Sequence, residues 1–396
     1  MVEMHKYGNI IDKYYIQIVE LISSLSQSTV PYLRRVLRFL ALPYCFLFIV
    51  NWNECRLSKY KVMKDLLYIF FTLKYYPDNY TQCRLWEKDR KQWRYYYGSI
   101  YDPYQRGKLR KEVQKKEYEI LFEDKEVCYQ LCEAAKFPLP KQHLCIHPNE
   151  KYKEDIKKIL YVNPFNKLII KPARGKGGKD IVLVSREDDG IYVRQKNTKI
   201  SLDEYVIYEK SVVQDYLNQH PSLASIAPST NTVRIVTLLT KRNDVIILGA
   251  HMRFGIGDAY IDNVSSGGIK VGIDIDKGCL KKIGFNQKGN QYICHPTSGI
   301  KFEDFKLPLW SSVVQLSMQI QRYFSYYKLL GYDLAITLDG PVIIEINATP
   351  DLAGLESAYG PILREKKVWE AFKEYNLLIN RKSKKAWINK DIILNK

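Results

Sequence analysis

Between Tyr118 and Leu355, short runs of branched apolar residues alternate with turns, and no other feature of the sequence restricts the fold as strongly. The runs include KLIIKP, DIVLV, SVVQDYL, TVRIVTLLT, DVIILGAHMRFG and PVIIEIN. Runs of this kind predict β-strands. Several consecutive runs are joined by turns that are too short for the crossover that parallel neighbours require. The sheet therefore need not be parallel, and the body of the protein is predicted to be α+β.

Helices are predicted before, within and after this body. Residues 1–115 carry apolar side chains at helical spacing, as in YYIQIVELISSL and VMKDLLYIFFTL. One helix should begin near Asp124 and end before Pro138, and another should cover 310–331, where a glycine would end it. The basic tail after Lys366 is also predicted to be helical.

The composition indicates a folded chain with a strong positive charge. Of its 396 residues, 46% are hydrophobic and 26% are charged, which argues against disorder and allows a large core. The length predicts about two or three lobes. The formal net charge of +18 favours anionic partners. Because no aromatic-basic module of a recognised type is present, nucleic acid is not a predicted partner.

The cysteines and one apolar segment bear on where the protein works. None of the eight cysteines forms a Cys-x-x-Cys pair and no signal peptide is evident, so we expect reduced cysteines, no zinc and a cytoplasmic location. Residues 38–50, RFLALPYCFLFIV, are too few to span a bilayer and are interrupted by Pro43. Two interpretations stay open: a core helix of the N-terminal lobe, or a peripheral helix on the inner face of the membrane.

A glycine-rich turn, KPARGKGGKD, connects two predicted strands. Gly175, Gly177 and Gly178 would let backbone amides approach an anion, and Lys171 ends the strand before the turn. The spacing excludes a Walker A loop, and the strand that follows excludes a Rossmann loop. The turn is either a phosphate-binding loop or a glycine hairpin with solvated lysines.

Asp333, Glu345 and Asn347 supply hard oxygen ligands within GYDLAITLDGPVIIEIN. Glu345 and Asn347 are two residues apart in a predicted strand and therefore face the same side. A carboxylate among apolar residues needs a cation or a donor. Mg²⁺ is held by a few carboxylate or amide oxygens together with phosphates and water. The pattern favours a magnesium–nucleotide site over its alternative, a salt-bridged acid with Asn347 capping a turn.

Two arginines on predicted strands are candidate phosphate clamps. Arg234 lies in NTVRIVT and Arg253 lies in HMRFG. Their planar guanidinium groups match phosphoryl oxygens, although an isolated arginine on a strand is usually an ion-pair partner. A second glycine turn follows in DNVSSGGI, and its amides could hold an acyl phosphate or a substrate carboxylate.

Taken in order, these motifs resemble the ATP-grasp superfamily over residues 117–355. More narrowly, NTVRIVT, RFG, DNVSSGGI, HPTSG and GYDLAITLDGPVIIEIN are similar to sugar-transfer-associated ATP-grasp proteins found near bacterial surface-polysaccharide genes. The resemblance implies an ATP-grasp fold, in which two α+β lobes grip ATP, after an N-terminal helical region. The expected parts are the helical region 1–115, the N-terminal and lid subdomains 116–216, the catalytic subdomain 217–365 and the basic tail 366–396.

The resemblance also implies roles for single residues. These roles are nucleotide binding by Lys125, Lys171, Gly175, Gly177, Gly178, Gln214 and Tyr216, magnesium binding by Asp333, Glu345 and Asn347, and stabilisation of the transferring phosphoryl group by Arg234. VVQDYL resembles the interdomain hinge of the family, where Gln214 and Tyr216 would contact adenine largely through the backbone. Two departures stand out. After this hinge, NQHPS lacks the acid that holds ribose in many relatives, so Asn218 or His220 substitutes or the contact is lost. Many ligases carry an arginine where this chain has Gly331, which leaves Arg253 as the candidate for that role.

The resemblance implies an ATP- and Mg²⁺-dependent carboxylate–amine ligase that works through an acyl phosphate. Its family context suggests that an acidic sugar, or its lipid- or nucleotide-linked precursor, receives an amino acid during the synthesis or modification of bacterial surface polysaccharide. Two alternatives stay open. One is an ATP-grasp kinase that phosphorylates a hydroxyl group. The other is a non-catalytic nucleotide-fold protein whose basic lobe binds membrane or nucleic acid.

Overall fold

The computed structural model describes residues 36, 39–99, 103–175, 180–195, 198–257, 259, 262, 267–287 and 289–378. The chain divides into two compact units. The sheet unit consists of Glu117–Leu239 and Ile247–Pro350. The helical unit consists of Met1–Lys116, Thr240–Ile246 and Asp351–Lys396, of which the structure describes residues 36, 39–99, 103–116, 240–246 and 351–378. The finer division at 116, 217 and 366 stays a prediction.

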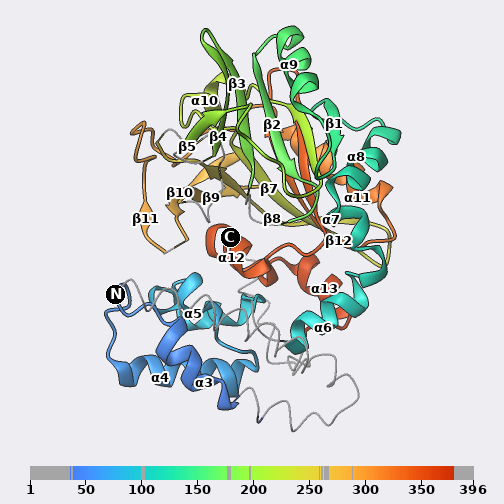
Figure 1. The fold of residues 1–396 in the computed structure, drawn as a ribbon. Helices are drawn as coiled ribbons and strands as arrows, with labels where there is room; N and C mark the ends of the chain where they lie inside the picture. The colour runs from blue at the N-terminus through green and yellow to red at the C-terminus, as the bar shows by residue number, and fades with distance from the viewer. Residues whose placement is uncertain are drawn as a thin grey trace. The chain divides into compact units, whose positions relative to one another are not determined.

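The first sheet of the sheet unit has six strands in the order β1-β6-β2-β3-β4-β5 (Figure 1). Each neighbouring pair is antiparallel, as the short turns predict. The glycine-rich turn lies between two paired strands, with Ile170 opposite Val182. The strands are β1 (Gln142–Ile146), β2 (Lys167–Pro172), β3 (Val182–Glu187), β4 (Gly190–Gln195), β5 (Thr198–Ser201) and β6 (Ser211–Asp215).

The second sheet has seven strands in the order β11-β10-β9-β8-β7-β12-β13. It places β12 between β7 and β13, with antiparallel pairing on both sides. All eight residues of β12 are buried, as a central strand requires. The strands are β7 (Thr232–Leu239), β8 (Val245–Phe254), β9 (Ile269–Asp274), β10 (Cys279–Phe285), β11 (Gln291–Tyr292), β12 (Leu329–Ile336) and β13 (Pro341–Asn347).

The helices of the sheet unit cover the two sheets through apolar faces. On α9, Ile156 and Leu160 pack with side chains of the six-stranded sheet. On α11, Val313 and Ile320 pack with side chains of the seven-stranded sheet, and α8 contributes Cys128 to the same core. The helices are α7 (Ile120–Glu123), α8 (Lys125–Ala134), α9 (Lys153–Val162), α10 (Pro221–Ala224) and α11 (Trp310–Tyr323).

The helix expected over residues 310–331 is shorter than predicted. It ends at Tyr323, and the chain then turns into β12, which already contains Gly331. The prediction was wrong because the apolar residues after the turn belong to a strand, and a short apolar run does not distinguish the two states. The predicted start near Asp124 is correct, since Asp124 caps α8.

The described part of the helical unit is built from short helices around its own core. That core includes Leu66, Ile69, Tyr80 and Trp93. No helix in the described part of the chain has the length and apolar character that spanning a bilayer requires. The helices and helical turns are α3 (Leu42–Tyr44), η1 (Cys45–Ile49), α4 (Lys59–Tyr68), η2 (Ile69–Leu73), α5 (Asn79–Gln82), η3 (Leu85–Glu87), η4 (Arg90–Tyr95), α6 (Pro103–Glu112), α12 (Leu352–Tyr359), η7 (Ile362–Arg364) and α13 (Lys366–Glu374), with η5 (Lys116–Tyr118) at the boundary of the two units.

Candidate active site

The first turn of α8 fixes the position of Lys125. The side chain of Asp124 accepts hydrogen bonds from the backbone N–H groups of Glu126 and Val127, at 3.2 and 3.4 Å, and so caps the helix. The Nζ of Lys125 donates to the carbonyl of Gly175 at 3.0 Å and lies 3.7 Å from Oε1 of Glu345. Lys125 thus connects the beginning of the glycine-rich turn to the end of β13.

Lys171 is a buried cation near the end of β2. Its Nζ donates to the carbonyl of Ile344 on β13 at 3.3 Å, and its side chain forms no ion pair with the described residues. Burial lowers the pKa of Lys171 to about 8; the charge of Glu345 partly offsets this effect and the charge of Lys125 adds to it. A buried ammonium group held in this way can bind an anion such as a phosphate.

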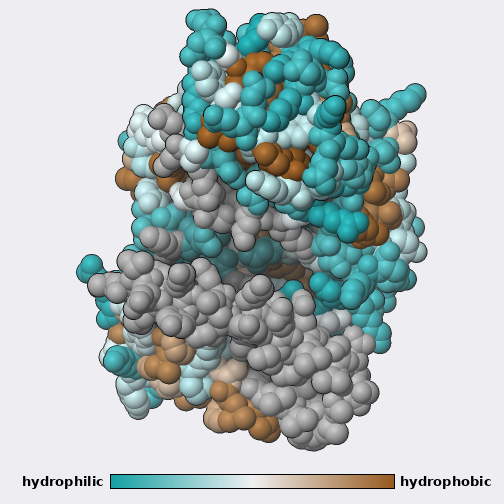
Figure 2. Space-filling view, in the orientation of Figure 1, coloured by the Kyte–Doolittle hydropathy of each residue, from teal (hydrophilic) through white to brown (hydrophobic). Residues whose placement is uncertain are grey.

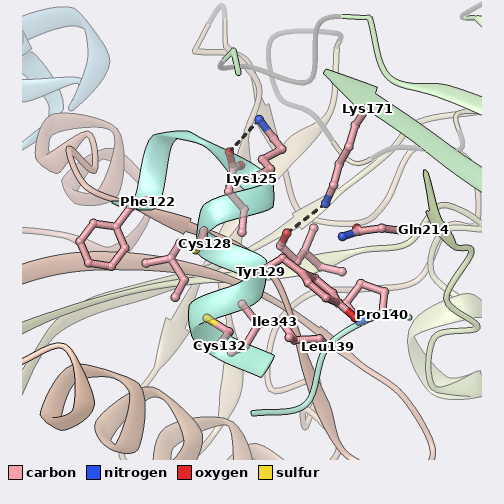
Figure 3. Close-up of a pocket in the computed structure, with 13 residues that line it drawn as sticks. Phe122, Lys125, Cys128, Tyr129, Cys132, Leu139, Pro140, Lys171, Gln214 and Ile343 are labelled. Atoms are coloured by element: carbon pink, nitrogen blue, oxygen red, sulfur yellow. Dashed lines mark hydrogen bonds and ion pairs between the residues drawn. The ribbon is translucent and has the colours of Figure 1, made fainter. Parts of the chain in front are cut away.

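The two lysines lie at the edge of a pocket between α8, β6 and β13 (Figure 3). Its free space is about 30 Å³, enough for about one water molecule, so side chains must move before a ligand can enter. Gln214 on β6 points into it and donates to Gln142 Oε1 at 3.1 Å. The pocket is lined by Phe122, Lys125, Cys128, Tyr129, Cys132, Leu139, Pro140, Lys171, Gln214, Ile343, Ile344, Glu345 and Ile346.

The predicted oxygen ligands meet on one face of the seven-stranded sheet. Asp333 on β12 is directly opposite Glu345 on β13, and Asn347 is opposite Gly331. Directly opposed side chains of an antiparallel pair lie close together on the same face. A β-bulge follows, because the next pair is Leu334 with Ile343. The register therefore brings both carboxylates and the amide to the C-terminal end of β13.

Asp333 is held by two arginines. Arg234 contacts both of its carboxylate oxygens, and the Nη2–Oδ2 distance is 2.8 Å. Arg253 on β8 adds a second Nη2–Oδ2 contact, also at 2.8 Å. Burial would raise the pKa of Asp333, but the two guanidinium groups hold it well below its usual range. The carboxylate is therefore ionised, although only 2% of the residue is exposed.

The structure explains why Gly331 stands where many ligases have arginine. A Cβ at this position would lie 2.8 Å from Cβ of Pro350, closer than two carbon atoms can approach without a shift. A larger side chain therefore does not fit. The guanidinium group of Arg253 reaches Asp333 from a different strand, and its role in catalysis stays a prediction.

A magnesium ion was predicted at Asp333, Glu345 and Asn347, and the donor set fits one in part. Glu345 is partly exposed, and Asn347 has a buried amide nitrogen without a hydrogen-bond partner. Rotation of this amide by half a turn would place its oxygen there as a ligand. Both oxygens of Asp333 already contact guanidinium groups, so a cation would share this carboxylate with Arg234 and Arg253. Among the described residues, no cluster of three or more His, Cys, Asp or Glu side chains is suited to a metal. A magnesium ion held by Asp333 and Glu345 would therefore need the amide oxygen of Asn347 as its third protein ligand.

The remaining predicted residues have different outcomes. Gly175 has a φ of 128°, a backbone conformation that favours glycine, whereas Gly177 and Gly178 lie outside the described residues. The ring of Tyr216 lies over Nζ of Lys167, 5.4 Å from its centroid, and does not line the pocket. The adenine contact predicted through the backbone of Tyr216 stays a prediction.

Sequence reasoning missed the group that orients Arg253. Its Nε and Nη2 donate to the hydroxyl of Thr232 at 3.0 and 2.7 Å. The backbone N–H of Thr232 in turn donates to Asp262 at 2.7 Å. Burial raises the pKa of Asp262, and the charge of Arg253 acts in the opposite direction. The only sequence signal was the position of Thr232, two residues before Arg234 and hence on the same face of β7.

Comparison with known families matches residues 104–370 to the family described as sugar-transfer associated ATP-grasp. This chain belongs to that family. The resemblance drawn from the motifs is thereby confirmed, and the chain has the ATP-grasp fold within the predicted α+β class. A comparison with curated protein sequences found no match.

Solved structures with a similar arrangement share little sequence with this family member. N5-carboxyaminoimidazole ribonucleotide synthetase in its ADP complex is 10% identical, with 64% of this chain and 53% of that chain covered and a TM-score of 0.36. D-alanine–D-alanine ligase from Bacillus anthracis is 12% identical, with 65% and 66% covered and a TM-score of 0.37. Biotin carboxylase from Campylobacter jejuni is 13% identical, with 63% and 46% covered and a TM-score of 0.37. This chain thus spans about half to two thirds of those chains.

Proposed function

We propose that this ATP-grasp protein is an ATP- and Mg²⁺-dependent carboxylate–amine ligase that forms an acyl phosphate. The convergence of Lys125, Lys171 and Glu345 on one pocket carries this proposal, because these three come from different segments of the chain. The two lysines can bind the phosphates of a nucleoside triphosphate. Glu345, together with the amide of Asn347, can hold the metal ion that accompanies these phosphates.

In this proposal ATP binds with its base between α8 and β6 and its phosphates toward the lysines. The apolar wall of the pocket suits a purine ring, and Gln214 supplies a polar contact. The backbone amides at Gly175 would approach the phosphates. Glu345 and Asn347 would hold Mg²⁺, with Asp333 as a further ligand. When bound, Mg²⁺ offsets the charge of the phosphates and fixes their orientation.

The proposed reaction has two steps. A carboxylate oxygen of the first substrate attacks the γ-phosphorus of ATP, and the bond from that phosphorus to the bridging oxygen breaks to give an acyl phosphate and ADP. An amine then attacks the acyl carbon, loses a proton, and displaces phosphate to give the amide. Arg253 and Arg234 lie on one sheet face with the acidic residues, where guanidinium groups can stabilise charge on the moving phosphoryl group.

The proposed substrates follow from the sugar-transfer description of the family. An acidic sugar, or its lipid- or nucleotide-linked precursor, would supply the carboxylate, and an amino acid would supply the amine. This assigns the protein to the synthesis or modification of bacterial surface polysaccharide on the cytoplasmic side. The net charge of +18 suits acidic substrates.

The stoichiometry of ADP and phosphate release tests the reaction. Purified protein is incubated with ATP, Mg²⁺, and uronic-acid sugars and amino acids, each alone and in pairs, and the products are identified by mass spectrometry. A ligase releases phosphate and forms an amide only when both substrates are present. A stable phosphoester formed with one substrate alone would instead establish a kinase.

The residue assignment is tested with Glu345→Gln, which should lower Mg²⁺-dependent turnover at least about a hundredfold because a charged ligand becomes neutral. Glu303→Gln is the matched control, since Glu303 is an exposed carboxylate of the same unit that pairs with Lys282 at 3.5 Å. Wild-type turnover in Glu345→Gln, with its fold intact by circular dichroism, would contradict the metal site.

A further inference from the structure

The helical unit exposes a concentration of large apolar side chains. All of the large hydrophobic residues exposed in its described part lie between residues 36 and 71. Contiguous apolar surface of this kind on a protein marks an interaction site. Figure 2 shows apolar surface over the region of α3 and α4. The residues are Val36, Phe39, Leu40, Leu47, Phe48, Tyr60 and Phe71, which we call the apolar patch.

Ring contacts join the two segments that carry the patch. The rings of Phe39 and Phe71 are 5.7 Å apart and connect the first segment to η2. Leu47 and Phe48 are neighbours in η1, and the ring of Phe48 lies 5.2 Å from that of Tyr44. Tyr60 lies in the first turn of α4, which continues into η2.

Basic side chains flank this surface. Arg56, Lys59, Lys61 and Lys64 are exposed, and none of them forms an ion pair with the described residues. The ammonium group of Lys64 lies over the ring of Tyr60, 4.4 Å from its centroid. The two acidic residues nearest in sequence already have ion-pair partners, since Asp65 pairs with Arg90 and Glu54 shares Arg84 with Glu87.

We propose that the apolar patch and its flanking basic residues bind the surface of an anionic phospholipid bilayer. Aliphatic and aromatic tips would enter the boundary between headgroups and acyl chains, while the four cations contact anionic headgroups. Cations beside an exposed apolar surface match the negative charge of an anionic headgroup layer above its acyl chains, which favours lipid. Nucleic acid would leave the leucine and phenylalanine side chains in water. This inference does not depend on the proposed ligase reaction.

Sedimentation with lipid vesicles tests the proposal on the full chain. The vesicles contain phosphatidylcholine alone, or phosphatidylcholine mixed equally with phosphatidylglycerol. The wild type should sediment with the mixed vesicles only, and rising salt should release it. Changing Leu47 and Phe48 together to Glu should weaken binding at least about tenfold. Leu47 is 59% exposed and Phe48 is 66% exposed, so both side chains would enter the lipid. Lys59→Gln and Lys61→Gln should each weaken it about fivefold.

The matched control is the double variant Val162→Glu and Leu338→Glu in the sheet unit. Val162 is 83% exposed and Leu338 is 69% exposed, and neither belongs to the patch. The control should bind as the wild type does. Absence of wild-type binding to anionic vesicles, or unchanged binding of the Leu47 and Phe48 variant, would overturn the proposal. A change of oligomeric state in that variant would also overturn it, because the patch would then be covered by protein. If that variant instead melts at a lower temperature, the two lysine variants decide the test, since both residues are already in solvent. Unchanged binding of both lysine variants would then overturn the proposal.

Discussion

At Asp333, both oxygens of a buried carboxylate are engaged by guanidinium groups, whereas Glu345 on the neighbouring strand is partly exposed. Asp333 and Glu345 were both predicted to be ligands of a magnesium ion. Their surroundings differ, because Asp333 is shared by Arg234 and Arg253 within the sheet, while Glu345 faces Lys125 at 3.7 Å. Asp333 therefore contributes to the stability of the fold, and Glu345 is available for a ligand.

We expect Asp333→Ala to lower the free energy of unfolding by about 3 to 5 kcal/mol, because it removes the ion-pair partner of the partly buried Arg234 and leaves Arg253 with Asp262 alone. Glu345→Gln should lower it by less than about 1 kcal/mol, since its ion pair is long and partly solvated. Urea denaturation followed by circular dichroism measures both. Equal losses in the two variants would contradict this division of roles.

The N-terminus of α8 shows how an element positions a functional side chain. Asp124 caps the helix and also contacts Nε of Arg174 at 3.2 Å, and the backbone N–H of Lys125 donates to Ala173 at 2.8 Å. Burial would raise the pKa of Asp124, but hydrogen bonds from the backbone of Val127 and from Arg174 hold it below its usual value. The cap therefore depends on the ionised carboxylate.

We expect Asp124→Ala to lower the free energy of unfolding by about 1 to 2 kcal/mol and to raise the KM for ATP. Asp124→Asn should recover part of the loss. A carboxylate whose pKa is lower in the folded state than in the unfolded state stabilises the fold above the unfolded pKa, and this stabilisation is lost as the pH falls. The advantage of the wild type over Asp124→Asn should therefore decrease below about pH 4 and disappear at lower pH. Urea denaturation over a pH series measures this advantage, and an advantage that grows toward acid would refute the assignment.

Segments far apart in the chain, residues 39–116 and 351–378, both contribute to the helical unit. Glu356 on α12 is buried and accepts from the backbone N–H groups of Tyr97 and Gly98, at 2.8 and 2.7 Å, and from that of Ile362 at 3.2 Å. A Cβ on Gly98 would lie 2.6 Å from Cα of Ala353, so glycine is required for this close approach. One carboxylate thus joins segments that are 258 residues apart.

We expect Glu356→Gln to destabilise the protein by about 2 kcal/mol, because the amide can accept from only one of the two N–H groups of the loop. Glu370→Gln is the matched control in the same unit, since Glu370 is exposed and its Lys366 partner lies 3.8 Å away. The midpoint of urea unfolding should fall for Glu356→Gln and remain unchanged for the control. Identical midpoints in the two variants would refute the structural role of Glu356.

Local patterns in the sequence were enough to predict β2, β3, β6, β7, β8 and β13, the start of α8, and the position of Glu345 and Asn347 on one face of β13. Each of these follows from neighbours a few residues apart, through strand alternation or helix capping. The arrangement around Asp333 could not be read in this way, because Arg234 is 99 residues from it and Arg253 reaches it from a further strand. The steric exclusion at Gly331, the hydrogen bond from Lys171 to β13 and the grouping of residues 39–116 with 351–378 likewise depend on which segments the folded sheet and core bring together.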